Sequence, residues 1–509
     1  MHVESKVQTL PELARIVAEC KRHGKRVVHC HGVFDLLHIG HIRYFRQAAQ
    51  MGDVLVVTVT PDRYVDKGPH RPAFPESLRL EGVVSQHTVD YGAINTWATA
   101  EELLRFIQPD IYVKGSDFKS IDADPTGKLQ REAEVCKELG IELELTKDIV
   151  FSSTNLINRF LSTLPDDVQE YLEIFRSRYS IAEIEDILDA MRGLKVTVVG
   201  DTIIDDYQYC NPLGAASKEP IMALRSVGGD VFAGGVLAVA NHLSNFVDKV
   251  QLFTVLGETD CGRWEGFVRE SLHGNVVPNF EYQRDAPTIR KRRYIEGYSM
   301  TKLLEIYHMD DGGLDAGRDG RFRTALMASG NASDVVVAAD FGHGTISPDC
   351  RRDLVQTPFL AVNTQANAGN RGFHTISCYE RCDFVSLAEP ELRLDARDTK
   401  TGIIPLVDRL QRQTNASMVA VTRGKQGSFI QTADGTGVLV PAFASKAVDR
   451  IGSGDAFFSM TALAACMKVK PELVAFLGNI IGSIAVGIVG NKKSITRTDV
   501  MKLVTSLLK

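Results

Sequence analysis

The stretch His31-Gly32-Val33-Phe34-Asp35-Leu36-Leu37-His38-Ile39-Gly40-His41 joins a short apolar run to a longer amphipathic one. The apolar run, Val27–Cys30, is typical of a buried strand, and the run after the stretch predicts a helix. His38 and His41 are three apart at the expected helix start, so both imidazoles share one face. A helix start also attracts anions. The stretch therefore predicts two imidazoles that stabilise charge on a phosphate under attack.

The sequence around this stretch keeps alternating between buried strands and amphipathic helices. A capping box, Thr9 to Glu12, starts the first helix. The other expected strands are Val54–Thr60, Ile111–Lys114 and Ile141–Leu145, and the expected helices are His41–Met51, Glu76–Ser85, Ala100–Ile107 and Lys128–Leu139. This alternation predicts βαβ units and a parallel sheet.

A second series of strands begins at Lys195, and each strand runs into a polar turn. The strands are KVTVVGD, DVVVAAD, FLAVNT, CDFVSL and MVAVTRG. Parallel strands end at the ligand edge of an open α/β sheet, so we expect chemistry at these turns. The charged segment between the two series has a helical pattern and no motif. We therefore expect an α/β protein with a domain at 1–163, a helical linker at 164–192 and a second domain at 193–509.

The composition is that of a globular protein. Of 509 residues, 44% are hydrophobic and 24% charged, which excludes a disordered, collagenous or disulfide-scaffold chain. The net charge of −6 argues against a nucleic-acid partner. The nine cysteines have no paired short spacing, which indicates free thiols in a reducing compartment. Cys378 and Cys382 are the closest pair, but no second pair accompanies them, so a metal site is disfavoured.

Two segments bear on membranes and secretion. The N-terminus is polar, with no apolar core for a signal peptide, so we expect a cytoplasmic protein. The stretch Leu473–Gly490 has no charge and reaches the minimal length of a membrane span. It contains Asn479, Ser483 and four glycines, and no aromatic belt. We therefore expect a helix buried in a soluble core, with membrane association as the alternative.

The first motif resembles the G-x-F-D-x-x-H-x-G-H signature of the cytidylyltransferase-like nucleotidyltransferase superfamily. The resemblance implies a Rossmann-like fold and catalytic roles for His38, His41 and Lys114. Class I aminoacyl-tRNA synthetases also carry His-Ile-Gly-His, but the lysine-rich second signature they predict is absent. The implied nucleotide-binding residues are Gly32, Val33, Phe34, Asp35, Gly40, Asp62, Lys67, Arg79, Ser152, Ser153 and Thr154.

A second motif lies near the C-terminus, Asp449-Arg450-Ile451-Gly452-Ser453-Gly454-Asp455. Two glycines bracket an expected helix start, whose N–H groups form an anion hole for a transferring phosphoryl group. Asp455, held at that start, is placed to take the proton from an attacking hydroxyl. An ordinary glycine turn capped by aspartate is the alternative.

The region Lys195–Lys509 resembles the ribokinase-like (PfkB) carbohydrate kinases, which implies an α/β sandwich with a small β lid. Asp455 is then the catalytic base and Glu391 helps to organise Mg²⁺. The implied sugar-binding residues are Asp201, Asp205, Gly234, Gly235, Asn241 and Asp340, and the implied nucleotide-binding residues are Thr422, Gly424, Gly427, Gly452, Ser453, Gly454 and Asn479.

The chain departs from the kinase pattern at three points. Ala388 stands where the family has an asparagine, and Asn363-Thr364-Gln365 replaces an aspartate-proline-lysine turn. Arg450 replaces a small threonine. These departures leave the base and the anion hole in place. They leave open the alternative that this domain binds sugar phosphate with little or no turnover.

Together the two regions resemble the bifunctional heptose 7-phosphate kinase/heptose 1-phosphate adenylyltransferases, with the domain order reversed. The resemblance implies phosphorylation of a sugar phosphate at O1, then transfer of a nucleotidyl group to the sugar 1-phosphate. It also implies Mg²⁺, ATP, small-molecule substrates and a homo-oligomer, a dimer formed through the kinase domain. The alternative is a CTP-dependent cytidylyltransferase for another sugar or polyol phosphate. Neither nucleic acid nor a membrane is an expected partner.

Overall fold

The computed structural model describes residues 3–65, 72–115, 128–146, 164–444 and 447–508. The chain divides into two compact units, residues 1–163 with 505–509, and residues 164–504. Both units are α/β, as the alternation of strands and helices predicts. Each unit is described by itself.

The first unit is built on one parallel sheet with the strand order β3-β2-β1-β4-β5. Its strands are β1 (Val27–Gly32), β2 (Val54–Val59), β3 (Tyr91–Ile94), β4 (Ile111–Lys114) and β5 (Glu142–Leu145). Its helices are α1 (Val3–Lys6), α2 (Leu10–Arg22), α3 (Ile39–Ala49), α4 (Glu76–Val84), α5 (Ala100–Ile107) and α6 (Lys128–Leu139), with a 3₁₀ turn η1 (Asp62–Tyr64). The strand order reverses between β1 and β4, which creates a crevice at their carboxyl ends.

The second unit is built on a mixed sheet with the strand order β9-β8-β6-β12-β13-β14-β15-β16-β17. The pairs from β9 to β15 are parallel, and β16 and β17 are added antiparallel. The strands are β6 (Val196–Ala215), β8 (Val250–Gly257), β9 (Val276–Gln283), β12 (Val335–Asp340), β13 (Leu360–Thr364), β14 (Phe384–Ala388), β15 (Met418–Thr422), β16 (Ser428–Thr432) and β17 (Gly437–Val440).

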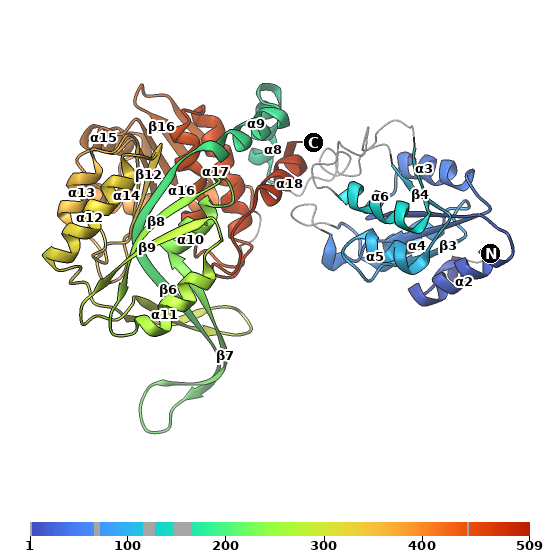
Figure 1. Cartoon of the computed structure of the whole chain (residues 1–509), viewed down its shortest axis with the longest axis horizontal. Coiled ribbons are helices and arrows are strands. Elements are labelled where there is room, and N and C mark those ends of the chain that lie inside the picture. Colours follow the sequence, from blue (N-terminus) through green and yellow to red (C-terminus); the bar gives the residue numbers. More distant parts are fainter. Residues whose placement is uncertain (1–2, 66–71, 116–127, 147–163, 445–446, 509) are drawn as a thin grey trace. The chain divides into compact units, whose positions relative to one another are not determined.

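The strand β6 is 20 residues long and belongs to two sheets. Its first part pairs with β8 and β12 in the main sheet. Its second part pairs with β7 (Met222–Gly235) and β10 (Arg290–Glu296), and β10 pairs with β11 (Lys302–His308). Figure 1 shows the β6–β7 ribbon extending beyond the rest of this unit. This small sheet is the lid that the resemblance implied.

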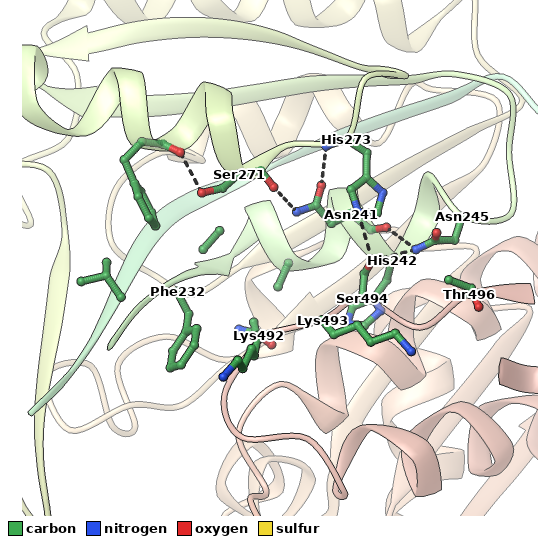
Figure 2. A pocket seen from close by; sticks show the side chains of 15 residues that line it. Phe232, Asn241, His242, Asn245, Ser271, His273, Lys492, Lys493, Ser494 and Thr496 are labelled. Atoms are coloured by element: carbon green, nitrogen blue, oxygen red, sulfur yellow. Dashed lines mark hydrogen bonds between the residues drawn. The ribbon is translucent and has the colours of Figure 1, made fainter. Parts of the chain in front are cut away.

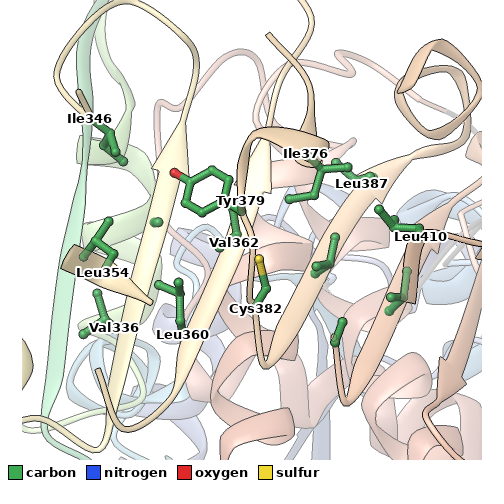
Figure 3. Close-up of a cluster of buried hydrophobic side chains, with 14 of the residues drawn as sticks. Val336, Ile346, Leu354, Leu360, Val362, Ile376, Tyr379, Cys382, Leu387 and Leu410 are labelled. Carbon is green, nitrogen blue, oxygen red and sulfur yellow. The ribbon is translucent and has the colours of Figure 1, made fainter. Parts of the chain in front are cut away.

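Helices cover both faces of the main sheet. On one face, α16 packs against both α10 and α17, and α10 lines a pocket (Figure 2). On the other face a large apolar core lies between the sheet and α12 to α15, with Val336, Leu360 and Leu410 inside it (Figure 3). The helices are α10 (Val236–Leu243), α11 (Cys261–Ser271), α12 (Ala316–Gly330), α13 (Pro348–Leu354), α14 (Glu389–Ala396), α15 (Ile403–Thr414), α16 (Ser453–Cys466), α17 (Pro471–Ala485) and α18 (Arg497–Leu508), with 3₁₀ turns η3 (Met191–Gly193), η4 (Ile376–Cys378) and η5 (Gly424–Gln426).

The segment that we expected to be a linker is packed onto the second unit. It forms α8 (Asp166–Arg178) and α9 (Ile181–Ala190). Phe175 of α8 is fully buried, and its ring stacks on Phe476 of α17 with 4.1 Å between centroids. Arg497 contacts Glu185 of α9 at 3.2 Å. These helices are therefore part of the second unit's packing rather than a free connection.

The uncharged stretch Leu473–Gly490 begins inside α17, which is buried from Leu473 to Ile481. The side-chain amide of Asn479 donates to the carbonyl oxygens of Val440 and Pro441, at 2.9 and 3.1 Å, so its polar group is satisfied inside the core. Within the part of the chain that the structure describes, no helix has the length and apolar character needed to cross a membrane.

We predict that Phe175→Ala lowers the free energy of unfolding of the second unit by about 3–5 kcal/mol, because it leaves a cavity against Phe476. Unfolding by urea is followed through Trp264 fluorescence in a Trp97→Phe background. Ile174, which is 45% exposed on the same helix, is the control, and Ile174→Ala should cost less than about 1 kcal/mol. Equal, small effects of both changes would mean that α8 does not stabilise this unit.

Candidate active sites

In the first unit, the predicted histidines lie at the start of α3, directly after β1. His38 is the N-cap, and its Nδ1 accepts the Gly40 N–H at 3.1 Å. A neutral imidazole that accepts at Nδ1 carries its proton on Nε2, so His38 keeps a donor on that side. The rings of His38 and His41 are 4.1 Å apart between centroids, as their spacing predicts.

Phe34 shapes this corner by a backbone conformation that few side chains adopt. Its φ is 49°, and its buried ring meets His41 edge-on with 5.4 Å between centroids. A Cβ on Gly32 would lie 3.0 Å from the Phe34 ring. Gly32 is therefore required by the packing of Phe34, besides any approach of a phosphate. The Asp35 carboxylate accepts the Ala73 N–H at 2.5 Å.

Arg79, predicted to bind nucleotide, is only 2% exposed and is bonded by the protein itself. Its guanidinium donates to the carbonyl oxygens of Phe74, Val33 and Thr60 and pairs with Asp62 at 2.5 Å. The structure thus gives Arg79 a positioning role: it ties the segment after β1 to the segment after β2. Its contact with nucleotide stays a prediction.

Lys114 ends β4, next to β1 in the sheet, as the motif predicts. Its ammonium pairs with the Glu132 carboxylate at 2.8 Å, and Glu132 also accepts the Tyr112 hydroxyl at 3.2 Å. His29, fully buried beneath this edge, has its pKa lowered to about 3 by burial and by the Lys114 charge. Lys114 and the two imidazoles therefore lie at the carboxyl ends of neighbouring strands of the sheet. The predicted residues Lys67, Ser152, Ser153 and Thr154 lie outside the described ranges.

In the second unit, the glycine motif forms the start of α16. Gly452 is the N-cap with φ +82°, and a Cβ there would collide with the Asn491 Oδ1. No atom lies within 4 Å of a Cβ placed on Gly454, so the helix start is open on that side. Asp455 lies in the first turn. Burial raises its pKa to about 7, and the Asp205 and Glu391 carboxylates add to the shift while Lys291 opposes it.

The carboxylates of β6 face the lid and the glycine loop. Asp205 pairs with Arg293 of β10, and a Cβ on Gly234 would collide with the Asp205 Oδ2. Asp201 is fully buried and accepts the backbone N–H groups of Phe341, His343 and Thr345 after β12. Asp201 therefore shapes the neighbouring turn, and a direct role in sugar binding stays a prediction.

Sequence reasoning missed the basic residues of the lid. Lys291 and Arg293 alternate with half-buried positions on β10 and are 4% and 7% exposed. Lys291 is in register with Asp205, and burial lowers its pKa. Lys302 of β11 pairs with Asp449 of the glycine motif at 2.6 Å, and Tyr207 donates to the same carboxylate at 2.9 Å. The sequence feature that could have predicted them is the run Arg290–Arg293, which is four cations in a chain with a net negative charge.

Asp340 and Asn241 are occupied within the protein. The Asp340 carboxylate accepts the Tyr379 hydroxyl at 2.7 Å and lies 3.1 Å from His374 and 3.7 Å from Arg351. The side chain of Asn241 donates to the Ser271 carbonyl and accepts the His273 N–H, as Figure 2 shows.

Asp340, His374 and Cys378 have ligand atoms within 4.8 Å of one another, a spacing that suits a metal ion. The Asp340 carboxylate is already bonded and has the Arg351 charge beside it, which disfavours a cation there. Cys382 lies in the apolar core beside Tyr379, so it does not join Cys378 (Figure 3). All nine cysteines are free thiols.

The residues predicted to bind Mg²⁺ and the nucleotide lie at the same end of the sheet. Glu391 accepts the N–H groups of Ala388 and Ala366, at 2.8 and 3.2 Å, and burial raises its pKa. The carboxylates of Glu391 and Asp455 are electrostatically coupled, and such hard oxygen donors fit Mg²⁺. Thr422 ends β15, and Gly427, with φ +82°, allows the following hairpin to approach the Val440 carbonyl.

Two families match the chain. The family described as "Cytidylyltransferase-like" matches residues 29–159, and "pfkB family carbohydrate kinase" matches residues 376–497. The two matched regions contain His38, His41 and Lys114 in one case and Glu391 and Asp455 in the other. The chain therefore joins a nucleotidyltransferase-like domain to a carbohydrate-kinase domain, in the order that the motifs predict.

Curated relatives carry the name "Bifunctional protein HldE". That of a Nitratiruptor species is 39% identical over 118 residues, 23% of this chain and 26% of the relative. That of Aliarcobacter butzleri is 33% identical over 158 residues, 30% of this chain and 31% of the relative. Each match spans about a third or less of the length of these relatives.

The fold is similar to that of phosphofructokinase-2 from Escherichia coli in complex with potassium, with a TM-score of 0.52 and 13% identity over 62% of this chain and 100% of that one. The tetrameric inhibited form of that enzyme matches with a TM-score of 0.51, also at 13% identity, 62% of this chain and 100% of that one. At this identity the likeness concerns the fold alone, and it agrees with the ribokinase-like prediction.

We predict that Asp455→Asn makes the second unit more stable than the wild type above pH 7, and that the gain vanishes near pH 4. The native carboxyl, with a pKa of about 7 against an ordinary 3.8, binds a proton that the unfolded chain releases between these values. Wild-type stability therefore falls as the pH rises through this window, by on the order of 4 kcal/mol at most.

Urea unfolding at several pH values, followed through Trp264, checks this dependence. The control is Asp398→Asn, because the backbone and hydroxyl of Thr401 lower the pKa of that exposed carboxyl to about 2. For this carboxyl, wild-type stability rises with pH, because the unfolded chain binds the proton more tightly than the native state. The control variant should therefore lose stability relative to the wild type as the pH rises from 2. An Asp455→Asn gain that does not change with pH would contradict the assignment.

Proposed function

We propose that the chain makes a nucleotide sugar in two steps, a phosphorylation in the second unit followed by a nucleotidyl transfer in the first. The observation that carries the proposal is Asp455 at the open start of α16. Its pKa, near 7, suits a group that takes a proton at neutral pH. The two family matches place a nucleotidyltransferase-like and a carbohydrate-kinase region in one chain, which supports coupling the two reactions.

In the kinase step, Asp455 takes the proton of the sugar O1 hydroxyl while O1 attacks the γ-phosphoryl group of ATP. The N–H groups at the start of α16 hold the negative charge that develops on that group. Gly454 leaves this side of the helix start open, and Gly452 allows the turn to pack against Asn491. Mg²⁺ bound through Glu391 would supply further neutralising charge when present.

The lid supplies positive charge for a phosphorylated sugar. Lys291 and Arg293 lie on one face of β10, beside Asp205 and next to the glycine loop of Gly234. The Asp205–Arg293 pair fixes the guanidinium, and Lys291 has no carboxylate within salt-bridge distance in the described chain. We propose that Lys291 contacts the sugar's own phosphate, which is why the substrate is a sugar phosphate rather than a free sugar.

In the transfer step, an oxygen of the sugar 1-phosphate attacks the α-phosphorus of a nucleoside triphosphate, and pyrophosphate leaves. His38, His41 and Lys114 stabilise the charge that forms on the α-phosphate, and the start of α3 adds its N–H groups. No covalent intermediate on the protein is required. Lys114 must turn from Glu132 toward the phosphate in this scheme, a rotation of a long side chain at the sheet edge.

The specific substrates rest on the resemblance of the two motif sets. We propose D-glycero-D-manno-heptose 7-phosphate as the sugar and ATP as the nucleotide in both steps. Another sugar or polyol phosphate with CTP is the second candidate, because the histidine motif does not select a base. The residues Ala388 and Asn363 favour a slow kinase within either scheme, since Ala388 lacks the amide of the usual asparagine and Asn363 lacks the carboxylate of the usual aspartate.

Two variants should separate the reactions. Asp455→Asn should reduce sugar-dependent ATP consumption by about 10³-fold or more and leave pyrophosphate release from a supplied sugar 1-phosphate unchanged. His41→Ala should do the reverse, since the imidazole acts only in the first unit. Coupled assays for ADP and for pyrophosphate measure the two steps in the full chain. Loss of both activities in either variant would contradict two independent sites.

We also propose that the protein is a dimer joined through the lid. Large apolar side chains are exposed on the β6–β7 ribbon, with Leu213, Ile221, Met222 and Val227 between 53% and 64% exposed. Exposed apolar groups on a strand pair are the usual sign of a partner, and a second copy offers a matching ribbon.

Ile221→Lys with Leu213→Lys should convert the dimer to a monomer in analytical ultracentrifugation, because the added charges are costly to bury. Ile404→Lys is the control, since Ile404 is 53% exposed on α15, away from the lid. A wild-type chain that sediments as a monomer at micromolar concentration would refute the proposal.

A further inference from the structure

A pocket of about 570 Å³ lies in the second unit between α10, the segment Ser271–His273 and the segment 491–496 (Figure 2). Its volume is that of a small-molecule site. Ala238, Asn241 and His242 line it from one face of α10, and Asn245 lines it from just beyond the end of the helix. Asp205, Lys291 and Asp455 do not line it, but Ala233 and Asn491 do. Ala233 precedes Gly234, and Asn491 lies against Gly452, so the pocket adjoins the kinase centre.

Most polar groups around the pocket are bonded to one another. The Ser494 hydroxyl lies 2.9 Å from the Asn245 amide and 3.1 Å from the His273 Nε2. Asn241 bonds to Ser271 and His273, and the Ser271 hydroxyl donates to the Phe267 carbonyl at 2.7 Å. This network fixes the wall and leaves few groups that a ligand would have to displace.

His242 is the exception. It is 4% exposed, and its Nδ1 accepts the Ile495 N–H at 3.3 Å. Burial, with a contribution from His273, lowers its pKa to about 4, so the ring is neutral at pH 7. The proton of a neutral ring that accepts at Nδ1 is on Nε2. Nε2 has no hydrogen-bond partner within the described chain, so the N–H donor of this mostly buried ring is left for a ligand in the pocket.

The rim of the pocket adds positive charge and apolar walls. Lys492 is exposed, and the described part of the chain supplies no acidic partner for it, whereas Lys493 pairs with Asp499 at 3.1 Å. Phe232 and Phe267 form the apolar part of the lining. A buried donor, an ammonium group and two aromatic rings together suit an anion that carries a planar or apolar portion.

We propose that this pocket, which adjoins the kinase centre, binds a small phosphate-bearing molecule through residues other than Asp205, Lys291 and Asp455. The phosphate accepts the His242 N–H and lies beside Lys492, and the rest of the molecule contacts Phe232 and Phe267. This proposal does not depend on the reactions proposed above.

Hydrogen-exchange mass spectrometry of the full chain tests the proposal with AMP and inorganic phosphate as probes. Saturating AMP should slow amide exchange in the segments 236–245 and 491–496. Protection by inorganic phosphate would show that the phosphate group is enough for binding. Protection by AMP but not by inorganic phosphate would show that contacts with the Phe232 and Phe267 rings are also needed. No protection of these segments by either probe would overturn the proposal.

Variants sharpen the test. His242→Asn keeps an acceptor for the Ile495 N–H but removes the buried donor, and it should raise the AMP concentration for half-maximal protection at least about tenfold. His242→Gln, whose amide places a donor near the former Nε2, should retain most of the affinity. Lys492→Gln should also weaken binding, whereas Lys249→Gln, an exposed lysine outside the pocket, should not. Equal affinity in Lys492→Gln and Lys249→Gln would contradict the assignment, even if His242→Asn failed to fold.

Discussion

Both candidate sites depend on the same constraint: a charged group buried at the carboxyl edge of a sheet must be fully paired. In the first unit this group is Arg79, whose guanidinium joins the segments after β1 and β2. In the second unit the groups are Asp201 and Asp205 on β6. Asp201 holds the turn after β12, and Asp205 holds Arg293 of the lid. One strand thereby fixes the main sheet and the lid relative to each other.

Most of the fold could be predicted from the sequence, because buried parallel strands are short uninterrupted apolar runs. Ala100–Ile107 and Lys128–Leu139 are helices with the expected bounds. The pattern failed for β3, a four-residue strand that contains Gly92, and for β10, whose buried positions are charged. The pattern also predicted a linker at 164–192. The residues that pack on these helices lie about 300 positions away in the sequence, so the helices' own charged sequence is typical of a solvent-exposed segment.

The candidate sites could be predicted where one segment carries the whole feature. The His38–His41 pair and the turn before Asp455 are local, so residue spacing was enough. The charges around Asp455 come from β6, β10 and α14, and only the fold brings them together. Asp201, Asn241 and Asn479 show the opposite case. Their side chains match motif positions, yet each is bonded to backbone groups of its own unit.

The central claim is that one chain phosphorylates a sugar phosphate at O1 and then joins that phosphate to a nucleotide. The most direct test is mass spectrometry of the products formed from heptose 7-phosphate and, in a second reaction, from heptose 1-phosphate, with Mg²⁺, ATP and CTP supplied together in each. The account predicts a sugar 1,7-bisphosphate in the first reaction and, in the second, a nucleoside diphosphate sugar that carries adenine, with release of pyrophosphate. A cytosine product would assign the first unit to CTP, and the absence of any phosphorylated or nucleotidylated sugar would contradict the account.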